Sequence, residues 1–254
     1  MSEIIHNPWT ELRRFTSARL ALGRAGDSLP THEVLEFGLA HARARDAVHA
    51  PLDVATLSQE LKAAMFSPVH VQSAAPDRAQ YLRRPDMGRR LSAASRAILS
   101  AKLGRMKKPD VVFVIADGLS AVAPARHAVP VLKEITMRLQ GWRVAPIIVA
   151  TQARVALGDE IGELLCAEMT VMLLGERPGL SSPHSLGIYL LYKPHIGASD
   201  ADRNCISNIR PEGLSYEAAA HKLHYLMTGA RSLGASGVAL KDDSDTGMLP
   251  DKHS

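Results

Sequence analysis

The sequence predicts an α/β protein: a helix-rich amino-terminal region followed by a Rossmann-like, mostly parallel sheet with flanking helices. Two observations carry this prediction. Residues 111–116 read VVFVIA, a continuous run of strand-forming residues that is typical of a strand buried on both faces. From there to residue 233, segments of helical and of strand character alternate, which is the pattern of a parallel sheet with crossover helices.

The first predicted unit, residues 1–108, reads as helices joined by loops. Helical spacing predicts one helix over residues 8–22 and a second through EVLEFGLAHARARDAVH, which Thr31 can cap. DVATLSQELKAAM is predicted as a third helix and PVHVQSAAPDRAQYL as a loop or connector. Asp86 can cap one more helix, so this region is expected to be helix-rich, with extended pieces as the alternative.

The second predicted unit, residues 109–241, alternates strands and helices. VVFVIA is followed by a helix over 124–139 and the strand VAPIIVA, and then by a helix over 156–166 and the strand MTVMLLG. LGIYLLY adds a strand before a final helix over 215–233. The remaining residues, 242–254, are polar and are predicted to form a disordered tail.

Composition limits the classes of protein that fit. The chain has 254 residues, of which 46% are hydrophobic and only 4% aromatic, so we expect an aliphatic core. No apolar run reaches the roughly 18 residues of a membrane span, and the amino end lacks the order of a signal peptide. We therefore expect a cytoplasmic chain with no membrane association. Two cysteines, Cys166 and Cys205, are too few for a disulfide scaffold and are expected to be reduced thiols.

The excess of positive charge lies mostly in the amino-terminal part of the chain. The formal net charge is +4, and the arginines concerned are Arg13, Arg14, Arg19, Arg24, Arg43, Arg45, Arg83, Arg84, Arg89 and Arg90. Clustered arginines can attract nucleic acid, but these alternate with carboxylates and apolar residues instead of forming one basic face. We therefore expect no nucleic-acid partner and favour a docking surface for a protein, since the guanidinium group binds carboxylates and carbonyls.

One strand end suggests an enzyme in its own right. Asp117 directly follows VVFVIA and Ser120 is close behind it, an order that also occurs in metal-dependent hydrolases. A stand-alone metal-dependent α/β hydrolase centred on Asp117 is therefore the alternative function. The sequence has no HExxH or similar ligand cluster, which favours a turn or cap role for Asp117. His41 and His49 share a helical face with Arg45, whose charge would repel a cation, so no metal ligand is assigned.

Three consecutive blocks after residue 153 stand where predicted strands end. RVALGDEIG, GERPGLSSP and RNCISNIRPEGLSY are rich in polar and turn residues, which at strand ends build a ligand crevice. The loops after Ala150, Gly175 and Tyr192 are expected to lie side by side if their strands are neighbours. No GxGxxG motif or Walker loop follows any predicted strand, so the crevice is not a common phosphate cradle.

Within these blocks, Val155, Glu176 and Cys205 are the candidate ligand contacts, because they offer an apolar surface, an acceptor and a small soft side chain. Each also has a structural interpretation. Val155 could pack within a helix, Glu176 could pair with Arg177 or Arg154, and Cys205 could be a small buried residue. The residue types alone leave both interpretations open.

The blocks resemble the cobalamin-contacting segments of the small subunit of ethanolamine ammonia-lyase. NPWTELRRFTSARLALGRAGDSLPT, LAHARARDAVH, YLRRPDMGRRLS and VIADGLSA are also similar to segments of this family, so the resemblance runs from about Asn7 to Lys241. Residues 51–80 and the tail are the least similar. In the family, the valine of RVALGDEIG, the glutamate of GERPGL and the cysteine before ISNI contact the cofactor. The resemblance thus assigns cofactor binding to Val155, Glu176 and Cys205.

The resemblance implies a carbon–nitrogen lyase that converts ethanolamine to acetaldehyde and ammonia by a radical mechanism with adenosylcobalamin. It implies a large-subunit partner, a (β/α)₈ barrel that holds the substrate, in a hetero-oligomer with several copies of each subunit. No catalytic residue is then expected in this chain. Because the sequence has no DxHxxG motif, we expect the nucleotide base to remain the lower ligand of cobalt.

The resemblance also bears on location in the cell. It leaves two expectations, a cytoplasmic enzyme that is free or one held within a bacterial microcompartment. Some family members carry a longer leader before the NPW segment, and such a leader could serve as a packaging address. The sequence here starts close to that segment, which weakens the expectation of packaging.

Overall fold

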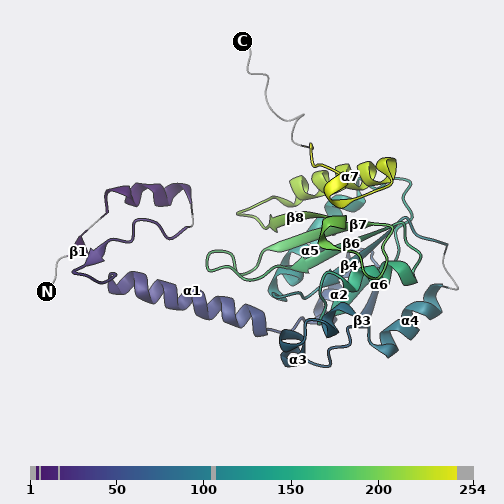
Figure 1. Cartoon of the computed structure of the whole chain (residues 1–254), viewed down its shortest axis with the longest axis horizontal. Coiled ribbons are helices and arrows are strands. Elements are labelled where there is room, and N and C mark those ends of the chain that lie inside the picture. The colour runs from purple at the N-terminus through teal and green to yellow at the C-terminus, as the bar shows by residue number, and fades with distance from the viewer. Residues whose placement is uncertain (1–3, 6, 17, 104–106, 245–254) are drawn as a thin grey trace, which may run out of the picture.

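A computed structural model describes residues 4–5, 7–16, 18–103 and 107–244, and it confirms the predicted α/β fold (Figure 1). Its centre is a six-stranded sheet in the order β3-β5-β4-β6-β7-β8. The first four of these strands are parallel, whereas β7 runs antiparallel to both β6 and β8. The strands are β3 (Pro68–Gln72), β4 (Val111–Ala116), β5 (Ile147–Thr151), β6 (Met169–Gly175), β7 (Leu186–Tyr192) and β8 (Arg203–Ile209).

Helices cover both faces of this sheet, because its central strands are apolar on both sides. Phe113 and Ile115 of β4 point into one core, which is closed by α2 (Val54–Ala63), α5 (Val122–Thr136) and α7 (Tyr216–Leu233). The alternate residues Val112 and Val114 point into a second core, closed by α4 (Ala93–Leu103) and α6 (Leu157–Leu164). The prediction of a strand buried on both faces, made from this apolar run, is therefore confirmed.

The amino-terminal arm, the described part of residues 4–49, extends away from this body (Figure 1). It consists of a short β1–β2 pair (Ile4–Ile5 and Arg24–Ala25), the 3-10 helix η1 (Pro8–Phe15) and α1 (Thr31–His49). The prediction of one helix over 8–22 was wrong beyond Phe15. The chain turns back after η1, and the Nε of Arg13 donates to the carbonyl oxygen of Leu20 at 2.7 Å. No residue of η1 is buried, so the apolar side chains of this segment do not pack on the body although they have helical spacing.

Two segments for which the sequence predicted no strand contain strands. PVHVQSAAPDRAQYL contains β3, which pairs with β5 at the sheet edge, and then α3 (Arg78–Arg83). Val69 and Val71 of β3 are buried while His70 between them is exposed, the alternation of a strand covered on one face. RNCISNI forms β8, the other edge strand. The sheet thus draws its first strand from the region before residue 109.

The rest of the chain follows the sheet. Short 3-10 helices form at Met87–Arg89, Asp200–Asp202 and Gly237–Ala239. Of the predicted tail 242–254, residues from 245 onward lie outside the described residues, and Asp242 pairs with Lys222 of α7 at 3.3 Å. Over the ranges that the structure describes, no helix is both long and apolar enough to span a membrane.

Candidate functional site

The structure brings the three candidate contact residues to one face of the sheet. Glu176 directly follows β6 and continues the alternation of Leu174, so it lies on the side that α4 and α6 cover. Val155, in the turn before α6, packs against the same core, as does Tyr189 of β7. Cys205 of β8 is paired directly with Tyr189 and shares its face. Residues from three separate sequence blocks therefore meet beside one strand.

A cavity of about 430 Å³ lies at this place. Its wall includes Val155, Leu174, Glu176 and Tyr189, together with Arg154 and Gly118 from the loops after β5 and β4. Cys205 lies one strand further toward the edge, where it and Ser207 are exposed. The cavity and the exposed part of β8 together combine apolar side chains with one carboxylate, that of Glu176, and two guanidinium groups, those of Arg154 and Arg177.

The Glu176 carboxylate is held on one side only. Its Oε2 accepts from the Oγ of Ser185 at 2.6 Å and from the backbone N–H of Asn208 at 3.3 Å. These partners replace the ion pair with Arg177 or Arg154 that the sequence left open. Oε1 has no hydrogen-bond partner among the described residues. A carboxylate oxygen beside an open cavity can accept from an amide N–H or a hydroxyl group of a ligand.

Tyr189 contributes an aromatic side chain to the wall of the cavity. Burial raises the pKa of its phenol, and the neighbouring Cys205 thiol raises it further. The side chain therefore stays neutral and presents an aromatic surface with a hydroxyl at its tip.

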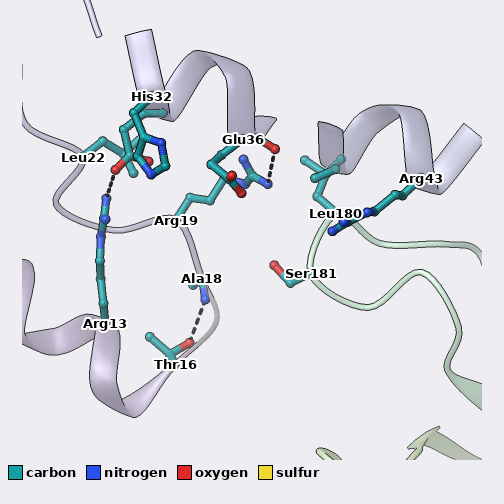
Figure 2. A pocket seen from close by; sticks show the side chains of 12 residues that line it. Arg13, Thr16, Ala18, Arg19, Leu22, His32, Glu36, Arg43, Leu180 and Ser181 are labelled. Carbon is teal, nitrogen blue, oxygen red and sulfur yellow. Dashed lines mark hydrogen bonds and ion pairs between the residues drawn. The ribbon is translucent and has the colours of Figure 1, made fainter. Parts of the chain in front are cut away.

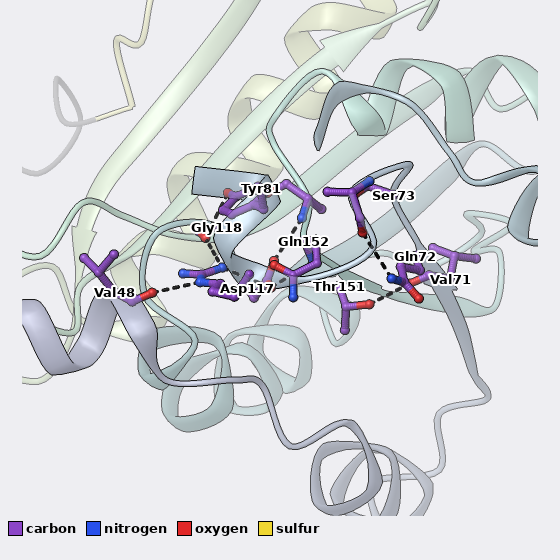
Figure 3. A network of polar contacts seen from close by, with 12 residues as sticks. Val48, Val71, Gln72, Ser73, Tyr81, Asp117, Gly118, Thr151 and Gln152 are labelled. Carbon is purple, nitrogen blue, oxygen red and sulfur yellow. Dashed lines mark hydrogen bonds and ion pairs between the residues drawn. The ribbon is translucent and has the colours of Figure 1, made fainter. Parts of the chain in front are cut away.

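Asp117, the centre of the alternative hydrolase, is part of an internal network (Figure 3). One carboxylate oxygen accepts from the N–H of Ala153 at 3.0 Å, and the other accepts from the N–H of Gln152 at 2.8 Å and from Arg78 at 3.2 Å. Burial raises the pKa of Asp117, which is 2% exposed. These hydrogen bonds join the loop after β4 to the loop after β5. One of the donors, Ala153, lies two residues before Val155.

The rest of this strand end is equally closed. Ser120 is fully buried, and its hydroxyl donates to the carbonyl oxygen of Pro183 at 3.0 Å. Arg78 also bonds the carbonyl oxygens of Gly118 and Val48, which links the end of α1 to β4. Within the described ranges, no three potential metal ligands come together. Asp117 and Ser120 are thus both buried and bonded within the protein, where they act as a scaffold for the neighbouring cavity.

Close backbone packing holds the loops after β4 and β6 together. The N–H of Leu119 donates to the carbonyl oxygen of Gly175 at 3.0 Å. A β-carbon at Gly175 would overlap the carbonyl oxygen of Ser120, so only glycine fits there. This contact places Glu176 next to the loop that follows β4.

One part of the predicted crevice was wrong. The loops after Ala150 and Gly175 are at the same edge of the sheet, but Tyr192 pairs with Met169 at the opposite end of β6. The cause is the antiparallel direction of β7, which sends its carboxyl end away from the cavity. The segment reaches the site only when the chain returns through β8.

A second cavity, of about 480 Å³, lies between the arm and the loop before β7 (Figure 2). Arg13, Arg19 and Arg43 line it from the arm, and Leu180 and Ser181 from the loop. Arg13 pairs with Glu33 at 2.7 Å, so part of the positive charge is neutralised within the arm. Three of the arginines that were predicted to form a docking surface therefore line one cavity. In contrast, Arg84 pairs with the neighbouring Asp86 at 2.8 Å on the body.

Sequence reasoning missed Ser185, Gly187 and Tyr189 as members of the site. The period of two in LGIYLLY was a usable signal, since it separates Gly187 and Tyr189 from the core residues Leu186 and Ile188. Ser185 carried no local signal, because its contact depends on which strand β7 pairs with.

Comparisons with known proteins bear on the whole chain. The family model described as ethanolamine ammonia-lyase light chain (EutC) matches residues 6–241. The ethanolamine ammonia-lyase small subunit of Ralstonia nicotianae is 53% identical over 252 residues, which is 97% of this chain and 92% of that protein. The small subunits of Azotobacter vinelandii and Pseudomonas fluorescens are each 53% identical, over 253 and 249 residues, covering 98% and 96% of this chain and 93% and 90% of theirs.

Proposed function

The chain belongs to the ethanolamine ammonia-lyase light chain family, and from this membership we propose that it is the small subunit of an adenosylcobalamin-dependent ethanolamine ammonia-lyase. Such an enzyme converts ethanolamine to acetaldehyde and ammonia, and adenosylcobalamin supplies the radical source for this reaction when bound. The chain itself binds and orients the cofactor, and it contributes no catalytic residue. The substrate is held by the large subunit.

The residues of the cavity fit one side of a corrin. The ligand is a broad, mostly apolar disc with a fringe of amides, so its binding wall needs apolar contact and a few acceptors. Val155 and Cys205 offer the apolar contact. Glu176 offers the acceptor, and the observation that carries the proposal is that this side chain lines the cavity while its Oε2 is anchored by Ser185. The other walls are assigned to the large subunit.

The arm is proposed as a docking surface for that large subunit. Its apolar side chains are largely exposed, with Trp9 at 66%, Phe15 at 73% and Leu35 at 67%. Exposed apolar patches of this kind mark interaction sites in soluble proteins. The division into a docking unit, 1–108, and a cobalamin-binding unit, 109–241, belongs to this proposal. β3 lies within the first range but pairs with β5 in the sheet of the second.

Charge reversal at arginines of the docking unit, residues 1–108, tests this proposal. Reversal of Arg13 with Arg14, or of Arg83 with Arg84, should weaken the complex. Because Arg13 also pairs with Glu33 inside the arm, Arg14→Glu alone is the cleaner change. Co-purification of the large subunit in unchanged yield with Arg14→Glu would count against docking through this surface.

The function is tested by purifying the chain from its own cells. A larger subunit should accompany it, and adenosylcobalamin should then support acetaldehyde release from ethanolamine. Glu176→Ala should weaken cobalamin binding by roughly tenfold, the effect of losing about 1.4 kcal/mol. Glu217→Ala, at an 80% exposed carboxylate of α7, is the matched control.

The opposite results are equally clear. A chain that purifies alone and gives no acetaldehyde with cobalamin contradicts the proposal. The expected cytoplasmic location, free or inside a bacterial microcompartment, belongs to the same proposal and is tested by cell fractionation.

A further inference from the structure

We infer that Ser185 is a positioning residue for the Glu176 carboxylate and that Gly187 keeps open the space that the free carboxylate oxygen occupies. The inference rests on the proposed function, because it assigns these residues a part in cofactor binding at the same cavity. Neither residue has to touch the ligand. Both act through Glu176, whose Oε1 is the atom offered to a ligand donor.

The strand register places Ser185 opposite Glu176. Gly175 pairs with Leu186, and the ladder continues by one step, with the N–H of Glu176 donating to the carbonyl oxygen of Ser185 at 3.1 Å. Ser185 is 7% exposed, so its hydroxyl is held away from solvent. From there the Oγ donates to Oε2 of Glu176 at 2.6 Å. A hydroxyl donor to a carboxylate at this distance is a strong, charge-assisted hydrogen bond.

A second contact limits rotation of the same carboxylate. The N–H of Asn208 donates to Oε2 at 3.3 Å, from the strand on the far side of β7. Asn208 has a positive φ of 61°, a conformation that asparagine tolerates better than most residues. Oε2 is thus bound by two donors from separate parts of the chain, and Oε1 is left for a ligand.

Gly187 provides the room for this arrangement. A β-carbon at position 187 would lie 2.9 Å from Oε1 and 3.1 Å from Cγ of Glu176. Any larger residue would therefore push the carboxylate away from its place. The glycine lies inside β7, where glycine usually weakens a strand, and close approach of another group is one reason for it to be there.

Pre-positioning of the acceptor favours binding for an entropic reason. A glutamate has three rotatable side-chain bonds, and freezing them when a ligand binds reduces the affinity. Here the hydrogen bonds to Oε2 hold the side chain before the ligand arrives. The same bonds could serve only to close the β6–β7 connection, and the two roles predict different results in a double-mutant cycle.

The experiment measures the affinity of the intact complex with its large subunit for cyanocobalamin, by equilibrium dialysis. Ser185→Ala should weaken binding by roughly three- to tenfold, the range expected when one long side chain must be ordered on binding instead of being held beforehand. In the Glu176→Ala background, Ser185→Ala should change the affinity by less than about twofold, because its partner is already gone. Gly187→Ala should also weaken binding when Glu176 is present and leave it unchanged when Glu176 is absent.

The control is the melting temperature of each complex, which separates a folding defect from a positioning effect. Equal weakening by Ser185→Ala in both backgrounds would overturn the inference, since Ser185 would then act through the loop and not through Glu176. An unchanged affinity for Ser185→Ala and Gly187→Ala, with Glu176→Ala still weakened, would overturn the inference and leave the proposed function standing. No effect of Glu176→Ala would overturn both the contact in the proposed function and the inference.

Discussion

In the body, the described residues from 50 to 244, charged side chains are buried with partners, whereas in the amino-terminal arm apolar side chains face solvent. The side chains of Arg203 and Asp159 are each 4% exposed and join β8 to α6 through two hydrogen bonds of 2.8 Å. In α1, by contrast, only Ala40 and Ala47 are buried, and Leu35 is 67% exposed.

This difference indicates that the two regions acquire their order from different sources. The body supplies its own core and its own hydrogen-bond partners. Most of the stability of a helix in a protein comes from packing of its apolar face, and α1 buries only Ala40 and Ala47. We therefore expect the folding free energy to reside in the body and the arm to contribute mainly to association.

The largest expected effect is at Asp117. Asp117→Ala leaves Arg78 as a buried charge and removes the acceptor of the Gln152 and Ala153 N–H groups. We expect the free energy of unfolding to fall by about 3–5 kcal/mol. Urea unfolding measures it. The control is Asp86→Ala at the exposed pair with Arg84, for which a loss below about 1 kcal/mol is expected. Similar losses for both variants would contradict the role of the network.

A glycine pair sharpens the same contrast. Gly175→Ala in the body forces a β-carbon against the Ser120 carbonyl and should lower the free energy of unfolding by about 3 kcal/mol. Gly38→Ala in α1 meets no atom within 4 Å and improves helix propensity, so it should raise helix stability by up to about 1 kcal/mol. Thermal melts of both variants test this. A destabilising Gly38→Ala would mean that the face of α1 that carries Gly38 packs against another part of the chain.

Association isolates the contribution of the arm. Leu35→Gln keeps a good helix former on an exposed position, so the free energy of unfolding of the chain alone should change by no more than about 0.5 kcal/mol. Its affinity for the large subunit should fall by roughly tenfold, if the leucine is a buried contact in the complex. Leu233→Gln, at a 54% exposed leucine that ends α7, is the matched control in the body. Unchanged binding of the Leu35 variant would argue against docking through α1.

The smallest effect concerns pH. The hydrogen bond from Arg143 lowers the pKa of Asp110 below 3.8, so the folded state holds this carboxylate ionised more strongly than the unfolded state does. Its stabilisation is present above that pH and is lost as the pH falls through the folded-state pKa. Because the Arg143 side chain is 59% exposed, the loss should stay below about 1 kcal/mol. Asp110→Asn should flatten this part of the acid limb in urea unfolding measured between pH 5 and about 2. An unchanged acid limb would contradict the assignment.

Much of the architecture could be predicted because it depends on the pattern of residues within each segment. The continuous apolar run of β4 and the helical periodicity of α5 and α7 depend on neighbouring residues alone. β3 and β8 were missed because each is an edge strand with few buried residues, so its pattern is short. The predicted helix was wrong beyond Phe15 because its apolar residues, although at helical spacing, are exposed and belong to no buried core.

The candidate site divides in the same way. The sequence by itself determined the residue types Val155, Glu176 and Cys205 and the family that they resemble. Only the tertiary structure decided that β7 runs antiparallel, which puts Ser185 opposite Glu176 and Tyr189 beside Cys205. The physical reason is that strand direction and register depend on pairing between distant segments, whereas periodicity within a segment reports only which face is buried.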